Sequence, residues 1–94
     1  MLRRATHPGI VLAEELEERG ISGTELARQI GVPANRISQL LRGKRAITGD
    51  TALRLGHWLK MSPQFWMSLQ AQYELAEAAK MSGGEIEKLP TLAA

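Results

Sequence analysis

The chain has 94 residues, a hydrophobic content of 44% and a formal net charge of +2, and it contains no cysteine. This size suits one domain with one modest core and excludes a second, catalytic domain, while the lack of cysteine excludes a disulfide framework and a thiolate metal site. Because no apolar run approaches the ~20 residues of a membrane-spanning helix, and the N-terminus lacks the apolar middle of a signal peptide, we expect a cytoplasmic protein with no membrane partner, metal ion or cofactor.

The first helix is predicted from about Pro8 to Arg19. Thr6 or His7 can cap it, Pro8 suits its first turn, and Gly20 supplies its stop. Its buried stripe is predicted to be Val11, Leu12 and Leu16. The glutamates of the opposite face are Glu14, Glu15, Glu17 and Glu18. That acidic face is either solvated surface or a contact for a basic protein partner.

Residues 22–43 have the pattern of two short helices joined by a tight turn, which is typical of a helix-turn-helix. Gly31 supplies the positive-φ stop after the first helix, Pro33 suits the first turn of the second, and Gly43 ends it. The first helix of this motif buries Leu26, Ala27 and Ile30 at helical spacing. The second helix buries Ile37, Leu40 and Leu41.

Ser22 and Glu25 have the S-x-x-E spacing of a capping box at the start of this motif. The Ser22 hydroxyl is expected to accept from the Glu25 amide while the Glu25 carboxylate reaches back. Because this end of a helix-turn-helix lies against the DNA backbone, Ser22 and Thr24 are also candidate phosphate contacts. For Ser22, a capping role alone explains the residue equally well.

The second helix of the motif leaves polar and basic side chains exposed, which makes it the candidate recognition helix in a major groove. These side chains are Asn35, Arg36, Ser38, Gln39 and Arg42, followed by Lys44 and Arg45. The charge distribution supports this prediction. Residues 19–60 carry eight basic groups against Glu25 and Asp50, whereas the segments on either side are net acidic. This pattern indicates a phosphate-binding face flanked by acidic surfaces.

A fourth helix is predicted to begin after Thr48, its cap, with Asp50 near the positive end of the helix dipole. The residues that close the core are Ala52, Leu55, Trp58 and Leu59. His57 lies among them and is expected to be a partly buried structural histidine.

A fifth, longer helix is predicted to start at Ser62-Pro63 and to run to about Lys80. Its first turn should pack on the core. The rest should project and, together with part of the fourth helix, form a dimer interface, since a symmetric dimer fits a palindromic operator. The interface residues are predicted to be Trp66, Met67, Gln70, Tyr73 and Glu74. The single domain is therefore predicted to span residues 1–80, with residues 81–94 as a flexible tail.

The chain resembles the HigA-type antitoxins, within the Xre or Cro/C1 class of helix-turn-helix proteins. The resemblance covers residues 7 to about 78 and rests on four segments: His7-Pro-Gly9, residues 25–48, Asp50-Thr-Ala-Leu-Arg-Leu55 and Ser62-Pro-Gln-Phe-Trp-Met-Ser-Leu-Gln70. The helix-turn-helix part is typical of the whole class. The His-Pro-Gly opening and the Ser-Pro-x-Phe-Trp segment are what indicate the antitoxin family.

This resemblance implies an all-α, five-helix fold of the lambda repressor-like type, with a longer C-terminal helix. It also implies a homodimer that represses its own operon through double-stranded operator DNA and neutralises a co-encoded, mRNA-cleaving, HigB-like toxin. The residues that would face base edges are Ala34, Asn35, Ser38 and Gln39. Those that would hold the DNA backbone are Ser22, Thr24, Arg36, Arg42, Lys44 and Arg45.

Within that surface, Asn35 and Gln39 are best suited to pair with adenine N6 and N7, and each good bidentate pair adds roughly 1–3 kcal/mol of discrimination. Arg36 could read guanine or hold phosphate, and the sequence alone leaves both open.

The sequence also bears on three other possible functions. The nearest alternative is a free-standing, phage-type transcriptional repressor with the same fold and no toxin partner. A structural or adaptor domain would have no salt-dependent affinity for DNA. An enzyme is not expected, because the sequence lacks a nucleophile-base set, a phosphate-binding glycine loop and a metal-ligand cluster, so we predict no catalytic residues.

Overall fold

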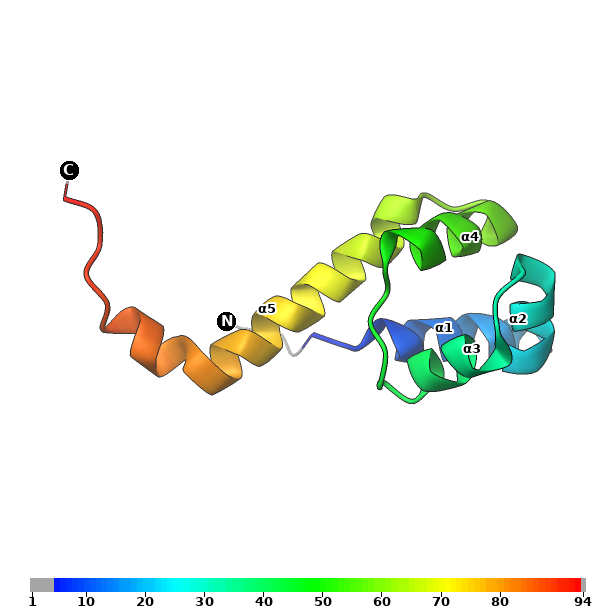
Figure 1. Cartoon of the computed structure of the whole chain (residues 1–94), viewed down its shortest axis with the longest axis horizontal. Helices are drawn as coiled ribbons and strands as arrows, with labels where there is room; N and C mark the ends of the chain where they lie inside the picture. The colour runs from blue at the N-terminus through cyan, green and yellow to red at the C-terminus, as the bar shows by residue number, and fades with distance from the viewer. Residues whose placement is uncertain (1–4, 94) are drawn as a thin grey trace.

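The structure, a computed structural model, describes residues 5–93, and within that range it consists of five α-helices without a strand. The helices are α1 (Pro8–Arg19), α2 (Gly23–Ile30), α3 (Ala34–Leu41), α4 (Gly49–Leu59) and α5 (Pro63–Glu87). Helices α1 to α4 form a compact group at one end, and α5 projects away from it (Figure 1). The predicted all-helical, five-helix architecture is thus confirmed. Residues 1–4, including Arg3 and Arg4, and residue 94 lie outside the described residues.

Local capping chemistry sets the starts of α1, α2, α4 and α5 and the ends of α1 and α2, as the sequence predicts, whereas α3 ends at Leu41 with Arg42, and not Gly43, as its C-cap. The N-terminal caps are His7, Ser22, Thr48 and Ser62, each of which accepts a backbone N–H of the first turn. Gly20 and Gly31 end α1 and α2 with φ angles of 64° and 70°, which glycine adopts without strain. Pro33 differs from the prediction: it is the N-cap of α3, and the helix begins one residue later.

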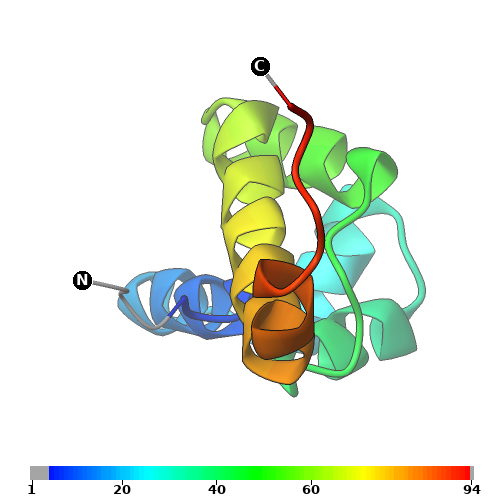
Figure 2. The ribbon, with the colours of Figure 1, turned by 90° about the vertical axis from the view of Figure 1, so that its left-hand side faces the viewer.

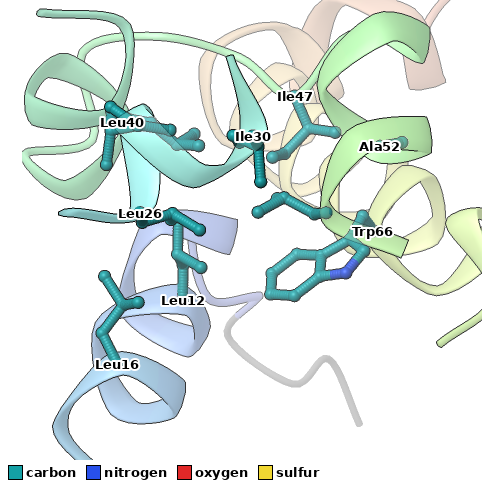
Figure 3. Close-up of a cluster of buried hydrophobic side chains, with 11 residues drawn as sticks. Leu12, Leu16, Leu26, Ile30, Leu40, Ile47, Ala52 and Trp66 are labelled. Carbon is teal, nitrogen blue, oxygen red and sulfur yellow. The ribbon is translucent and has the colours of Figure 1, made fainter. Parts of the chain in front are cut away.

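The core lies where α1, α2, α3 and α4 meet the first turns of α5 (Figure 3). Its buried apolar residues are Leu12, Leu16, Leu26, Ala27, Ile30, Ile37, Leu40, Ile47, Ala52, Leu55 and Trp66. Val11, Leu41, Trp58 and Leu59 are only partly buried and pack around it. His57 is exposed, contrary to the expectation of a partly buried histidine, because it lies on the outer face of α4.

The N-terminus of α1 lies directly against the C-terminal end of α3. A Cβ atom on Gly9 would stand 2.0 Å from the carbonyl oxygen of Leu40, closer than any real contact. The neighbouring His7 is buried, and its Nδ1 accepts the Gly9 N–H at 2.9 Å. The His-Pro-Gly segment therefore caps α1 and lets it approach the backbone of the candidate recognition helix.

Helix α5 is longer than predicted. It continues past Lys80 through Ser82-Gly83-Gly84 to Glu87, so the first seven residues of the expected tail are helical. Figure 1 shows the helix changing direction in its orange part, and Figure 2 views the molecule from that projecting end. The molecule consequently measures 52 × 24 × 23 Å. In the described part of the chain, no helix is both long and apolar enough for a membrane crossing.

Two residues assigned to the dimer interface are instead part of the subunit interior. The Trp66 side chain is fully buried in the core, and Gln70 is 5% exposed. The Gln70 Oε1 atom accepts the backbone N–H of Ile47 at 2.8 Å, and its Nε2 donates to Glu74. This part of the interface prediction is wrong, because the first turns of α5 bury these side chains against α4 and the preceding loop.

Candidate DNA-binding interface

Helix α3 presents its polar side beside the N-terminus of α2. The two helices pack together through apolar side chains. A Cβ atom on Gly23 would stand 3.0 Å from Cδ1 of Leu41 and 3.3 Å from Cγ2 of Ile37, so glycine lets the helices approach closely. A depression of about 550 Å³ lies between them, lined by Gly23, Thr24, Ala34, Asn35, Ser38, Leu41 and Arg42. Five of these residues were predicted to contact DNA. The fold therefore gathers base-reading and phosphate-binding candidates around one concave surface.

Ser22 and Thr24 lie at the edge of this surface, at the start of α2. The Ser22 Oγ atom accepts the Glu25 N–H at 3.1 Å, so the predicted cap is confirmed. The reciprocal half of the capping box is absent, since the Glu25 carboxylate binds Arg28 and Gln29 instead. Both hydroxyl side chains remain exposed. They can still donate to a phosphate oxygen placed at this helix N-terminus.

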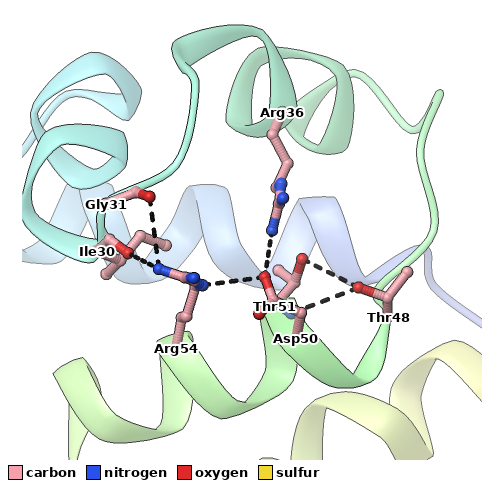
Figure 4. Close-up of polar contacts among 7 residues, drawn as sticks. All are labelled: Ile30, Gly31, Arg36, Thr48, Asp50, Thr51 and Arg54. Atoms are coloured by element: carbon pink, nitrogen blue, oxygen red, sulfur yellow. Dashed lines mark hydrogen bonds and ion pairs between the residues drawn. The ribbon is translucent and has the colours of Figure 1, made fainter.

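Arg36 does not point freely into solvent. Its Nη1 atom donates to Oδ2 of Asp50 in α4 at 2.6 Å, and its side chain is only 27% exposed. The same Asp50 oxygen accepts Nε of Arg54 at 2.9 Å, and Nη1 of Arg54 donates to the carbonyl of Ile30 at 2.7 Å. Figure 4 shows this chain of contacts running from α3 through α4 to the end of α2. Arg36 is thereby held on the α4 side of α3.

The carboxylates in these contacts are electrostatically stabilised. Hydrogen bonds from Arg36 and then Arg54 lower the pKa of Asp50 below its usual value. Hydrogen bonds from Arg28 and Gln29 lower the pKa of Glu25 to about 2. Both groups are therefore ionised at neutral pH, and each offsets part of the positive charge next to the candidate DNA-binding surface.

Gln39 and Arg45 form a second contact pair at the far end of α3. The Gln39 Oε1 atom accepts from Nε of Arg45 at 3.0 Å and from Nη2 at 2.7 Å. Gln39 is half-buried, whereas Arg45 and Lys44 are exposed. Sequence reasoning placed all three on the DNA-binding face but gave no sign that two of them bind each other.

The structure adds two residues, Asp50 and Arg54, to the site. The sequence analysis assigned neither of them a role there. Asp50 was interpreted only as a partner of the helix dipole, and Arg54 only as one of the basic groups. Their spacing of four residues on α4 is the signal that pairs them with each other. No sequence signal connects either residue to α3, because that contact depends on where the fold places the start of α4 relative to α3.

The remaining predicted interface residues lie outside the depression, on α5. Met67 is 38% exposed and Glu74 is exposed. Tyr73 is half-buried, and its ring meets the His7 ring edge-on at a centroid distance of 4.9 Å. Tyr73 thus holds α5 against the start of α1 within one subunit.

In residues 5–93, four short helices, a longer α5 and the exposed polar and basic face of α3 define a helix-turn-helix DNA-binding protein. Comparisons with known proteins agree: the family HTH_3, described as Helix-turn-helix, matches residues 12–66. An addiction module antidote protein of the HigA family from Coxiella burnetii has a structure similar to this chain, with 43% identity and a TM-score of 0.92. The match covers 97% of this chain and 100% of that one.

Two further proteins are similar. The antitoxin HigA of Pseudomonas aeruginosa, solved with the higBA promoter, is 40% identical with a TM-score of 0.91, over 96% of this chain and 100% of that one. YddM, an HTH-type transcriptional regulator of Escherichia coli K12, is 38% identical over 84% of this chain and 86% of its own length. The chain belongs to the HigA family of helix-turn-helix antitoxins.

Proposed function

We propose that this protein is the antitoxin of a type II toxin-antitoxin module, and that it represses its own operon by placing α3 in the major groove of operator DNA. The observation that carries the proposal is the polar face of α3 beside the depression at the α2 N-terminus. The Pseudomonas aeruginosa HigA, which has the same fold, was solved with promoter DNA. This function places the protein in the cytoplasm and requires no catalytic group.

The proposed DNA contacts divide into two classes. Base edges are read by Ala34, Asn35, Ser38 and Gln39, since three of these line the depression and the fourth adjoins it on α3. Phosphates are held by Ser22, Thr24, Arg42, Lys44 and Arg45, all of which are exposed, and two of which, Thr24 and Arg42, line the depression. The salt slope is the steepness with which the logarithm of the binding constant falls as the logarithm of the salt concentration rises. Each phosphate contact adds about 0.9 to this slope, so affinity should fall steeply as salt rises.

A homodimer is the form in which we propose that the protein binds its operator. Two α3 helices about 34 Å apart would read half-sites one helical turn apart. Support comes from the outer face of α5, where exposed apolar residues recur at spacings of three, four and seven or eight positions: Ala71, Leu75, Ala78, Ala79 and Ile86. Met67, Tyr73 and Glu74 flank this stripe and remain proposed interface residues. Exposed apolar residues on a projecting helix favour pairing with a second copy.

The toxin partner follows from membership of the antitoxin family, and we propose a HigB-like ribonuclease encoded by the adjacent gene. The alternative is a free-standing repressor without a toxin. One similar protein, YddM, is named only as an HTH-type transcriptional regulator.

One experiment separates the two. The protein is co-expressed with the product of the adjacent small gene and purified, and gel shifts of the shared upstream region are run with and without that product. Co-purification together with a specific shift supports the antitoxin-repressor. A specific shift without a bound partner favours the free-standing repressor, and absence of both contradicts the proposal.

A further inference from the structure

The contact between Arg36 and Asp50 has unequal consequences for the two arginines that share the carboxylate. Arg54 also donates to the backbone carbonyls of Ile30 and Gly31, so it stays in place without Asp50. For Arg36, Asp50 is the side chain that holds it within the described residues. Loss of the carboxylate would therefore release Arg36 and leave Arg54 where it is.

A released Arg36 would lie next to the DNA-reading surface. It follows Asn35, which lines the depression, by one residue and therefore by about 100° around α3. An arginine side chain on that flank can reach the phosphates that border the groove in which α3 lies. Every duplex has phosphates near that flank, so a mobile cation there can adjust to any sequence. The exact positions of these phosphates vary with the sequence-dependent shape of the duplex. An arginine held in one place serves only a duplex whose phosphates fall at that place.

We infer that Asp50 is a specificity-determining residue of the DNA-binding surface: its carboxylate holds Arg36 against α4 and so suppresses sequence-independent binding to phosphate. This inference rests on the proposed function, because it concerns the same α3 surface. Asp50 acts through Arg36 and is a positioning residue, without touching DNA itself. The chain thus keeps a basic face beside its reading helix while limiting what that face does on unrelated sequences.

The test compares binding of the full chain to two duplexes, one from the region directly upstream of its own gene and one with the same bases scrambled, across a range of salt concentrations. In Asp50→Asn, affinity for the scrambled duplex should rise about threefold per subunit, as expected for breaking an exposed ion pair. Its salt slope should steepen by about 0.9 per subunit. The ratio of upstream to scrambled affinity should then fall roughly tenfold for a dimer.

Two further variants isolate the cause. Glu15→Gln removes a carboxylate that pairs with Arg19 on α1, so it makes the same change in charge away from α3. It should leave the ratio unchanged. In an Arg36→Gln background, Asp50→Asn should alter neither the slope nor the scrambled-duplex affinity, since the side chain through which it acts is gone.

Three results would overturn the inference: an unchanged salt slope in Asp50→Asn, an equal effect of Glu15→Gln, or an undiminished effect in the Arg36→Gln background. A purely structural role would also overturn it, and it has a different signature, namely a lower melting temperature with weaker binding to both duplexes. If the wild-type chain binds the two duplexes equally, the proposed function itself fails. If the wild-type chain prefers the upstream duplex and Asp50→Asn leaves that preference unchanged, only the inference about Asp50 is overturned, and the proposed function stands.

Discussion

The side-chain oxygen of Gln39 accepts hydrogen bonds from both Nε and Nη2 of Arg45, at 3.0 and 2.7 Å. Because a guanidinium only donates, this contact fixes which end of the Gln39 amide faces Arg45 and leaves its NH₂ group free. A bidentate pair with adenine needs both ends, since the amide oxygen must accept from N6. While Arg45 is bound, Gln39 is therefore better suited to donate to a base acceptor, such as guanine O6 or N7 or thymine O4.

Replacing Arg45 with Ala should change the base that Gln39 prefers. Without the guanidinium, the Gln39 oxygen is free to accept, so preference at that position should shift towards adenine by roughly 1–3 kcal/mol. The measurement is selection from a pool of duplexes randomised across the half-site. Lys44→Ala is the matched control, because it removes a neighbouring charge and should weaken all sequences alike. Identical base preferences in the two variants would contradict a role for Arg45 in orienting Gln39.

The parts of this fold that the sequence predicts are those set by neighbouring residues. Ser22, Thr48 and Ser62 act as caps, and Gly20 and Gly31 as stops, because each acts within one turn of its own position. Contacts between distant segments were not predictable. The Arg36–Asp50 pair spans 14 positions and the Gln70–Ile47 contact spans 23, and both depend on the angles at which helices cross.

The length of α5 shows a different limit of sequence reasoning. Ser82-Gly83-Gly84 favours a helix end, yet the helix continues through it to Glu87. Glycine in a helix interior costs about 1 kcal/mol relative to alanine, which weakens a helix without forcing it to stop. The misplaced interface residues have another cause: periodicity places Trp66 and Gln70 on a helix face without indicating whether the chain's own core covers that face.

Gln70→Leu should destabilise the fold. The Ile47 N–H is buried, and losing its acceptor leaves it unpaired, at a cost of about 1–3 kcal/mol. Urea unfolding should register this as a lower midpoint with little change in slope. Gln72→Leu makes the same substitution at an exposed position of α5 and should alter stability by less than about 0.5 kcal/mol. Equal midpoints for the two variants would show that the Gln70 contact does not stabilise the fold.

Gly9→Ala should be among the most damaging single substitutions in the chain. The added Cβ would meet the Leu40 carbonyl oxygen at 2.0 Å, and that backbone atom cannot move without displacing α3. We expect a loss of about 3 kcal/mol or more in the free energy of unfolding, with weaker DNA binding as α3 shifts. Gly49→Ala is the control, since a Cβ there meets nothing within 4 Å. Equal melting temperatures for Gly9→Ala and Gly49→Ala would contradict the close approach of α1 and α3.

Glu25 should contribute to acid sensitivity. Its pKa is lowered from 4.5 to about 2 by hydrogen bonds from Arg28 and Gln29. Because the folded pKa lies below the unfolded one, the stabilisation is present above pH 4.5 and is lost as the pH falls towards about 2. Glu25→Gln should therefore show a smaller drop in melting temperature over that interval than the wild type. Glu17→Gln, with the same charge change on α1, is the control, and equal drops in both variants would remove Glu25 from this role.

Leu75→Glu should separate the dimer into monomers that still fold. Leu75 is 72% exposed within the subunit, so a glutamate there does not disturb the core, but it would place a charge in the apolar stripe on α5. Sedimentation or light scattering at micromolar concentration should give half the wild-type mass, with an unchanged helical circular dichroism spectrum. Tyr73 is a poorer probe, because its contact with His7 lies within one subunit. Leu53→Glu is the control for Leu75→Glu, since Leu53 is 63% exposed on α4 and lies outside the stripe. A dimer that survives Leu75→Glu but not Leu53→Glu would move the interface from α5 to α4.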